Sequence, residues 1–242
     1  MKRKTPQPIK WQKKLENYLQ KRNREYTGHD TDPTSPKFHA STIGYCKRQL
    51  YLNKTNLSDM NKKGLRIVNI GTSLHYIMEK LIKNDMEDHI ESEKPMPETE
   101  INGLKFVGTA DAVDTKNKVI YDFKTRGGWF KFSPPRKKHV DQLQIYMHGF
   151  DYPRGQLVYM SRKDFSMKHY PSISELDEIP SFDLGNALYI QKDKDRVEKL
   201  VQKGWEVLEK IRDYGVPETE DELNDIIPKC GCYICQNEVN LL

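Results

Sequence analysis

The sequence contains no long hydrophobic run. No stretch of its 242 residues approaches the roughly 20 consecutive apolar residues that a membrane-spanning helix needs. The first residues, Met1 to Lys4, lead into polar sequence without the apolar segment of a secretory signal peptide. We therefore expect an intracellular, cytoplasmic protein that has no membrane partner.

Cysteine is scarce, and two common sequence signatures are missing. The chain has 4 cysteines. There is no internal repeat, which excludes a solenoid, and no Gly-x4-Gly-Lys-Ser/Thr loop, so we expect no ATP-driven motor in this chain. The length suffices for one well-buried domain, so a metal or disulfide staple is not obligatory.

Charge of the two signs is unevenly distributed. The net charge is +5, yet residues 172–226 hold 15 acidic and 7 basic residues. The excess of positive charge therefore lies before residue 172, and the first 24 residues alone contain nine lysines and arginines against a single acid, Glu16. Such a segment suits a polyanion like DNA, although a solvated helix face or a frayed tail would have the same composition.

Hydrophobic periodicity predicts an α/β order of elements. Helices are expected at 9–26, 46–52, 67–83, 139–150 and 186–214, and strands at 89–94, 104–113, 119–125 and 155–162. A loop over 28–37 separates the first helix from the rest. The apolar stripe of the helix at 67–83 predicts a buried side made of Ile70, Leu74, Ile77, Met78 and Leu81.

Two carboxylates and a lysine are predicted to meet on a strand pair. Gly108-Thr-Ala-Asp111 ends one expected strand, and Asp122-Phe-Lys124 lies on the next, where side chains two apart share a face. Carboxylate-bound Mg²⁺ or Mn²⁺ could stabilise the charge that develops when water attacks a phosphodiester, and Lys124 would lie beside that water. As an isolated match, Asp-x-Lys would instead be an ordinary exposed strand edge.

These residues resemble the PD-(D/E)xK nuclease superfamily, and specifically its RecB-like branch. The resemblance covers Gly-x-x-Asp, Asp-x-Lys and a Gln-x3-Tyr motif at Gln142 and Tyr146, which share one helix face. It implies that Gln142 and Tyr146 position the lysine and contact DNA. It also implies that His75 is a metal ligand, although a histidine beside an apolar stripe is commonly structural.

The metal ligands expected from the motif and the resemblance together are His75, Asp111, Asp122 and the backbone carbonyl of Phe123. Glu79 and Glu93 are weaker candidates for a supporting role around these ligands. Among the same residues, Asp111, Asp122, Lys124, Gln142 and Tyr146 are the expected catalytic groups.

The cysteines resemble the iron–sulfur subgroup of RecB-like nucleases, which includes CRISPR-associated exonucleases and AddB-type nuclease domains. Cys46 precedes the motifs, whereas Cys230, Cys232 and Cys235 follow them. The resemblance implies a [4Fe-4S] cluster, but the tight Cys-x-Cys-x2-Cys spacing departs from the subgroup, and four thiolates could also bind Zn²⁺. Either metal would fasten the C-terminus to the N-terminal region. Two disulfides are disfavoured in an intracellular protein.

A basic, aromatic loop between Lys124 and the Gln142 helix is the predicted path of DNA. Aromatic faces can stack on unpaired bases while cations follow phosphates, which suits single-stranded DNA. The aromatic rings could equally be packed under the loop. The expected DNA-binding residues in and around this loop are Arg126, Trp129, Phe130, Lys131, Arg136, Lys137 and Lys138. Arg48, which lies near Cys46, is also expected to bind DNA.

The resemblance implies a fold and an activity. We expect an α/β restriction-endonuclease-like core, a mixed central sheet flanked by helices, with a basic arm at 1–37, a nuclease domain at 38–242 and a C-terminal helix and cysteine segment at 186–242. The expected activity is metal-dependent hydrolysis of single-stranded DNA from an end, 5′ to 3′. This activity would serve recombination, repair, replication or CRISPR adaptation. A helicase, recombination or adaptation protein would be the partner, and the protein could be cellular or viral. A structure-specific or flap endonuclease and a non-catalytic DNA-binding accessory factor are the alternatives.

Overall fold

The computed structural model describes residues 32–57, 62–128, 135–170, 189–232 and 235. The helix expected at 9–26 lies outside these residues, as do residues 28–31 of the loop expected at 28–37. No helix within the described ranges is long and apolar enough to cross a membrane.

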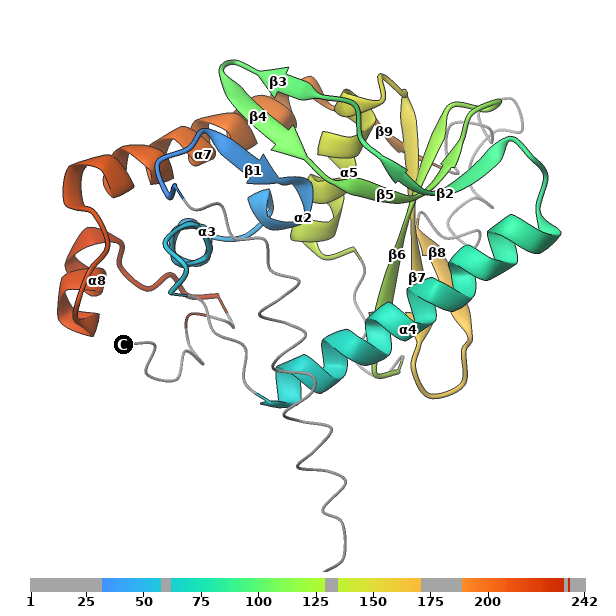
Figure 1. Cartoon of the computed structure of the whole chain (residues 1–242), viewed down its shortest axis with the longest axis horizontal. Coiled ribbons are helices and arrows are strands. Elements are labelled where there is room, and N and C mark those ends of the chain that lie inside the picture. The colour runs from blue at the N-terminus through green and yellow to red at the C-terminus, as the bar shows by residue number, and fades with distance from the viewer. Residues whose placement is uncertain (1–31, 58–61, 129–134, 171–188, 233–234, 236–242) are drawn as a thin grey trace, which may run out of the picture.

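A mixed sheet forms the centre of the molecule (Figure 1). Its strands run in the order β2-β5-β6-β7-β8, with β9 paired to β7, and β6–β7 is a parallel pair whereas the other neighbours are antiparallel. A smaller sheet has the order β1-β4-β3. The strands are β1 (Lys37–His39), β2 (Ile90–Pro95), β3 (Thr99–Ile101), β4 (Leu104–Val107), β5 (Thr109–Asp114), β6 (Val119–Arg126), β7 (Arg154–Ser161), β8 (Met167–Tyr170) and β9 (Ile190–Gln191).

Helices cover both faces of the large sheet. Leu157 and Val158, neighbours on β7, belong to different buried clusters, because successive side chains of a strand point to opposite faces. The cluster of Val158 packs against α4, and that of Leu157 packs against α5 and α7. The helices are α2 (Ala40–Ile43), α3 (Lys47–Lys54), α4 (Lys62–Asp85), α5 (Lys137–Gly149), α7 (Lys194–Tyr214) and α8 (Glu220–Ile226).

The expected mixed α/β architecture is confirmed, with one change in its strands. The strand expected at 104–113 is two strands, β4 and β5, which separate at Gly108 and belong to different sheets. The main chain passes from one sheet to the other just before the Gly-x-x-Asp motif. The short strands β1, β3 and β8 and the helices α2 and α8 were not anticipated, because three to seven residues carry too little periodicity. The expected start of the helix at 186–214 is wrong, because β9 occupies 190–191 and the helix begins at Lys194.

The long helix α7 has clear start and stop signals. Its N-cap Asp193 accepts a hydrogen bond from the Arg196 backbone N–H at 2.9 Å. Apolar residues three and four apart form its buried stripe. Gly215 ends the helix with φ of 73°, a left-handed conformation that glycine adopts without strain.

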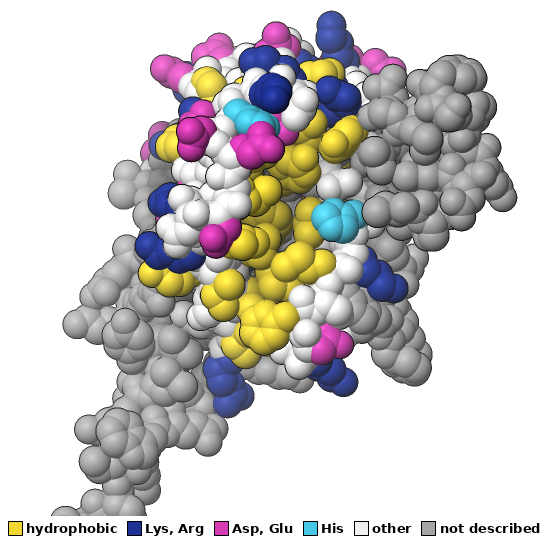
Figure 2. All heavy atoms as spheres, turned by 90° about the vertical axis from the view of Figure 1, so that its right-hand side faces the viewer, with side chains coloured by type: hydrophobic (Ala, Val, Ile, Leu, Met, Phe, Trp, Pro, Cys, Tyr) yellow, Lys and Arg dark blue, Asp and Glu magenta, His cyan; other side chains and the backbone are white. Residues whose placement is uncertain are grey.

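The predicted buried face of α4 is wrong for three of its five members. Leu74 and Met78 are buried, as expected. Ile70, Ile77 and Leu81 are 42–50% exposed, and Ile82 is buried in their place. The helix contacts the sheet along the narrow stripe i, i+4, i+8, so the neighbouring apolar positions face outward. Figure 2, which views the right-hand side of Figure 1, shows hydrophobic side chains gathered in a band.

Candidate active site and cysteine cluster

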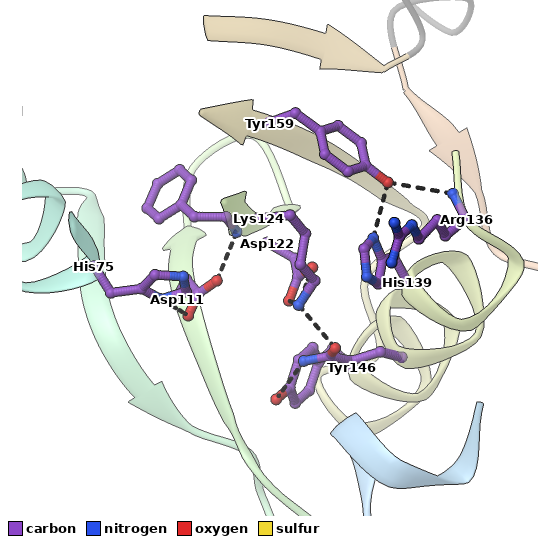
Figure 3. A network of polar contacts seen from close by, with 10 residues as sticks. His75, Asp111, Asp122, Lys124, Arg136, His139, Tyr146 and Tyr159 are labelled. Atoms are coloured by element: carbon purple, nitrogen blue, oxygen red, sulfur yellow. Dashed lines mark hydrogen bonds and ion pairs between the residues drawn. The ribbon is translucent and has the colours of Figure 1, made fainter. Parts of the chain in front are cut away.

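The site begins where two paired strands diverge. The antiparallel register of β5 and β6 ends at Ala112 and Tyr121, and beyond it β6 continues beside β7. The backbone N–H of Phe123 donates to Asp111 Oδ2 at 2.6 Å (Figure 3). A side-chain carboxylate therefore satisfies a donor of β6 where the β5–β6 pairing has stopped, and this contact fixes the orientation of Asp111.

Three potential metal ligands meet at the carboxylate of Asp111. His75, from α4, has Nδ1 at 3.1 Å from Asp111 Oδ1. Ligand atoms of His75, Glu93 and Asp111 all lie within 4.8 Å of one another. Burial opposes protonation of His75, but the hydrogen bond and charge of Asp111 outweigh it and raise the pKa of the imidazole. A cation held among these groups would relieve the repulsion between the two carboxylates.

Glu93 was only a weaker candidate from sequence, and its backbone explains its position. The pairs Ser92↔Ala112 and Lys94↔Ala110 flank it, so Glu93 lies opposite Asp111 on the neighbouring strand. Its φ is 48°, in the left-handed region that non-glycine residues rarely adopt. Burial, and then the charge of Asp111, raise the pKa of Glu93. Strained backbone of this kind clusters at functional sites.

Asp122 and Lys124 form an ion pair beside this triad. Lys124 Nζ lies 2.8 Å from Asp122 Oδ2 and 2.9 Å from Oδ1, and it also donates to Gln142 Oε1 at 2.8 Å. Burial raises the pKa of Asp122 to about 6, although the charge of Lys124 acts in the opposite direction. In this arrangement both carboxylate oxygens of Asp122 face the lysine.

The Gln-x3-Tyr helix joins the same network. Gln142 Nε2 donates to the Tyr146 hydroxyl at 3.3 Å, one turn along α5. Tyr146 also explains the glycine of the Gly-x-x-Asp motif, because a Cβ at Gly108 would lie only 2.8 Å from Tyr146 Cε1. The tyrosine ring therefore packs directly against the backbone that carries β4 into β5.

The site opens into a cavity of about 700 Å³ between α4, the ends of β6 and β7, and the start of α5. His75, Glu93 and Asp111 line one part of it, and three arginines line another: Arg126, Arg136 and Arg162. Two carboxylates that could hold a cation therefore share a cavity with guanidinium groups that could bind phosphates.

A half-buried histidine and a buried tyrosine in this cavity were not expected from the sequence. His139 Nδ1 lies 2.9 Å from the Tyr159 hydroxyl, which also accepts a hydrogen bond from the Arg136 backbone N–H at 3.4 Å (Figure 3). Burial, together with Lys124, Lys138 and Arg136, lowers the pKa of His139 to about 2. His139 is therefore a neutral imidazole, and the β7 register places Tyr159 beside Lys124. No local motif marks either residue.

The remaining predicted DNA contacts lie in different surroundings. Arg48 is 1% exposed and donates to the carbonyls of Leu223 and Ile227, at 3.4 and 2.7 Å. The prediction that Arg48 contacts DNA is therefore corrected, because its guanidinium holds the C-terminal segment. Lys137 and Lys138 lie at the start of α5. Trp129, Phe130 and Lys131 lie outside the described residues.

The four cysteines converge, although three lie almost at the other end of the chain from the first. Their sulfur atoms are all within 4.8 Å of one another. Cys46 Sγ lies 3.6 Å from that of Cys235 and 3.9 Å from that of Cys232. Four sulfurs at the usual zinc bond length would be about 3.8 Å apart, so the spacing fits one tetrahedral ion. A cubane cluster, with an iron atom behind each thiolate, would need a wider spacing.

The environment of the thiols differs from one to the next. Burial raises the pKa of Cys46 to about 11, whereas a hydrogen bond from the Cys235 backbone lowers the pKa of Cys232 to about 7. Cys46 is also the N-cap of α3 and accepts a hydrogen bond from the Gln49 backbone N–H at 3.5 Å. A bound cation would favour the thiolate form of all four residues.

Comparison with known proteins gives structural similarities without a sequence family. No family model and no curated protein matches the chain. The crystal structure of SSO0001 is similar over 90% of this chain and 96% of that chain, with a TM-score of 0.56 and 20% identity. This similarity shows a shared fold.

Two exonuclease structures are more distant. The alkaline exonuclease LHK-Exo from Laribacter hongkongensis has a TM-score of 0.45 and 12% identity, over 74% of this chain and 89% of that chain. A phage-related exonuclease from Haemophilus somnus 129PT has a TM-score of 0.36 and 17% identity, over 60% and 72%. These TM-scores are too low to support an argument about function.

Proposed function

We propose that the protein is a Mg²⁺- or Mn²⁺-dependent deoxyribonuclease of the RecB-like PD-(D/E)xK type. The observation that carries the proposal is the meeting of His75, Glu93 and Asp111 within 4.8 Å, next to the Asp122–Lys124 ion pair. Oxygen and imidazole donors of this kind suit Mn²⁺ and Mg²⁺. The cavity that these groups share with three arginines is suited to a phosphodiester.

Each group then has a distinct task. A divalent ion held by His75, Glu93 and Asp111 would act as a Lewis acid for the phosphate oxygens and the attacking water. Lys124, held by Asp122 and Gln142, places its ammonium where it can orient that water or offset charge on the phosphate. Asp122, which the sequence also predicts as a metal ligand, lies outside the His75–Glu93–Asp111 group. It can join the metal site by turning one carboxylate oxygen away from Lys124.

The finer assignments rest on the sequence resemblance. We propose single-stranded DNA as the substrate, cleavage from an end with 5′ to 3′ polarity, and a role in recombination, repair, replication or CRISPR adaptation. Arg126 and Arg136 line the cavity and would neutralise phosphates near the scissile bond. A branched oligonucleotide substrate that is blocked at every end tests the mode of cleavage, because an exonuclease leaves it intact and a structure-specific endonuclease does not.

Substitution of the buried carboxylate tests the proposal. Asp122→Asn keeps the shape of the side chain but removes the charge that pairs with Lys124, so Mn²⁺-dependent hydrolysis of linear single-stranded DNA should fall at least about 100-fold. The matched control is Asp213→Asn, an exposed carboxylate on α7. Hydrolysis that survives Asp122→Asn at the control's rate would exclude this site.

We propose that the cysteines hold a structural metal. The resemblance favours a [4Fe-4S] cluster, whereas the sulfur spacing favours a single ion such as Zn²⁺. Anaerobic purification followed by a visible spectrum and metal analysis decides between them. Broad sulfide-to-iron absorbance, together with iron and acid-labile sulfide, indicates the cluster. One zinc per chain without visible absorbance indicates the single ion. A protein that contains no iron and no zinc would contradict the proposal.

A further inference from the structure

A second cavity lies beside the cysteine cluster. Its volume is about 960 Å³, and it is enclosed by α3, α5, α7 and the segment that leads to the last three cysteines. Cys46 and Cys230 both contribute to its wall. No residue of the proposed catalytic set lines it, so it needs a separate explanation.

Positive charge predominates around this cavity. Three acidic residues line it, and two of them are already engaged within the protein. Asp141 binds Arg196 Nε at 2.7 Å, and Asp193 caps α7. Seven basic residues line it. Arg48, Arg196 and Lys47 are engaged by the C-terminal carbonyls, Asp141 and Glu206, which leaves Lys137, Lys199, Lys203 and Lys210. This balance suits an anionic ligand with several charged groups.

Lys203 is the most informative of these cations. Its Nζ donates to the Tyr45 carbonyl at 2.8 Å, the only hydrogen bond of that ammonium within the described residues. An ammonium has three N–H donors, so two have no acceptor among the described residues and could donate to a group in the cavity. Burial lowers the pKa of Lys203 to about 8, which an anion would reverse. Lys199 lies one turn earlier on the same face of α7 and is exposed.

The start of α5 connects this cavity to the catalytic one. Arg136 and His139 line the catalytic cavity, whereas Lys137 and Asp141 line the second. The two sets alternate within about one and a half helical turns, which corresponds to a rise of about 8 Å. Between them, Lys138 Nζ lies 4.7 Å from the ring centroid of Tyr45, which also lines the second cavity. The cations at 136, 137 and 138 thus form a continuous basic ridge between the cavities.

We propose that the second cavity binds backbone phosphates of the same DNA strand that occupies the catalytic cavity, with the strand crossing the N-terminus of α5. The inference rests on the nuclease function proposed above and extends its substrate site. It makes the cysteine-bound segment one wall of the DNA channel, so the metal would shape the substrate site as well as fasten the C-terminus. The rival explanation is that these cations only balance thiolate charge.

Salt dependence of DNA binding tests this assignment. The probes are phosphorothioate oligothymidylates of increasing length, bound in Ca²⁺ by the full chain over a range of salt concentrations. For long oligonucleotides, Lys199→Gln/Lys203→Gln should reduce the slope of log K against log salt by about 0.7 for each phosphate that the variant no longer neutralises. For an oligonucleotide too short to span both cavities, the slopes of wild type and variant should coincide.

Two further variants make the result decisive. Lys199→Glu changes only an exposed position of α7, so it should reduce the slope even if the double substitution disturbs packing. Lys105→Gln/Lys116→Gln removes the same charge from β4 and from the turn after β5, and should leave the slope at the wild-type value. If both α7 variants have the wild-type slope at every oligonucleotide length, the proposal is overturned. The cations would then only balance the negative charge of the cysteine thiolates.

Failure of the nuclease function would look different. Wild-type protein would then cleave no oligonucleotide with Mg²⁺ or Mn²⁺. The binding slopes are measured without cleavage, so they decide separately whether the second cavity binds DNA.

Discussion

The catalytic role that we propose for each residue depends on how its charged group is held. Asp111 is fixed by a backbone N–H at 2.6 Å, and Lys124 is fixed by Asp122 and Gln142. The sequence predicted these residues because Asp-x-Lys on a strand places both side chains on one face. It gave Glu93 only a supporting role, because the left-handed φ that Glu93 adopts opposite Asp111 has no sequence signature outside glycine.

His139 leads to a prediction about pH. Its pKa is lowered to about 2 in the folded protein, against an ordinary value of 6.5, so only the unfolded chain takes up the proton as the pH falls. Unfolding is therefore favoured below the ordinary pKa, and this residue should cost the protein about 2 kcal/mol of stability between pH 7 and pH 5. Urea denaturation across that range measures the effect.

The variant His139→Gln isolates this contribution. A glutamine can keep the hydrogen bond to the Tyr159 hydroxyl, but it does not titrate. Its stability should therefore fall less steeply with decreasing pH than that of the wild type. Equal slopes for the two proteins would mean that the imidazole is not held neutral in the folded state.

Hydrophobic periodicity predicts the presence of helix α4 but not which of its faces is buried. The apolar repeat predicted the helix and the burial of Leu74 and Met78. It could not choose between two apolar stripes, because the orientation of the helix is set by the sheet that it covers. The closeness of Gly71 to Thr125 of β6 shows how near the helix backbone comes to the sheet, since a Cβ there would lie 3.1 Å from Thr125 Oγ1.

Adjacent positions of α4 give a matched test of this orientation. Met78→Ala removes a side chain packed on the sheet and should lower the free energy of unfolding by roughly 2 to 5 kcal/mol. Ile77→Ala removes a side chain that is 50% exposed and should change it by only about 0.5 kcal/mol. Equal losses in urea denaturation would show that both faces of the helix are covered.

The whole molecule brings together residues that lie far apart in the sequence. The α/β class and the convergence of the motif strands followed from pattern and resemblance. The division of one expected strand into β4 and β5 did not follow, because the main chain changes sheets at Gly108, where Tyr146 from a distant helix packs. Nor did the position of Arg48, because only the folded chain shows which carbonyls of the C-terminal segment surround it. No local sequence pattern marks long-range contacts of this kind.

The proposed nuclease active site depends above all on Lys124, which is held beside Asp122 and the His75–Glu93–Asp111 triad. Its decisive test is the rate of Mn²⁺-dependent hydrolysis of linear single-stranded DNA by wild type and by Lys124→Ala. We predict hydrolysis by the wild type and a loss of at least about 100-fold in the variant, with the fold retained. A Lys124→Ala protein as fast as the wild type, or a wild type that cleaves no DNA, would contradict the proposal.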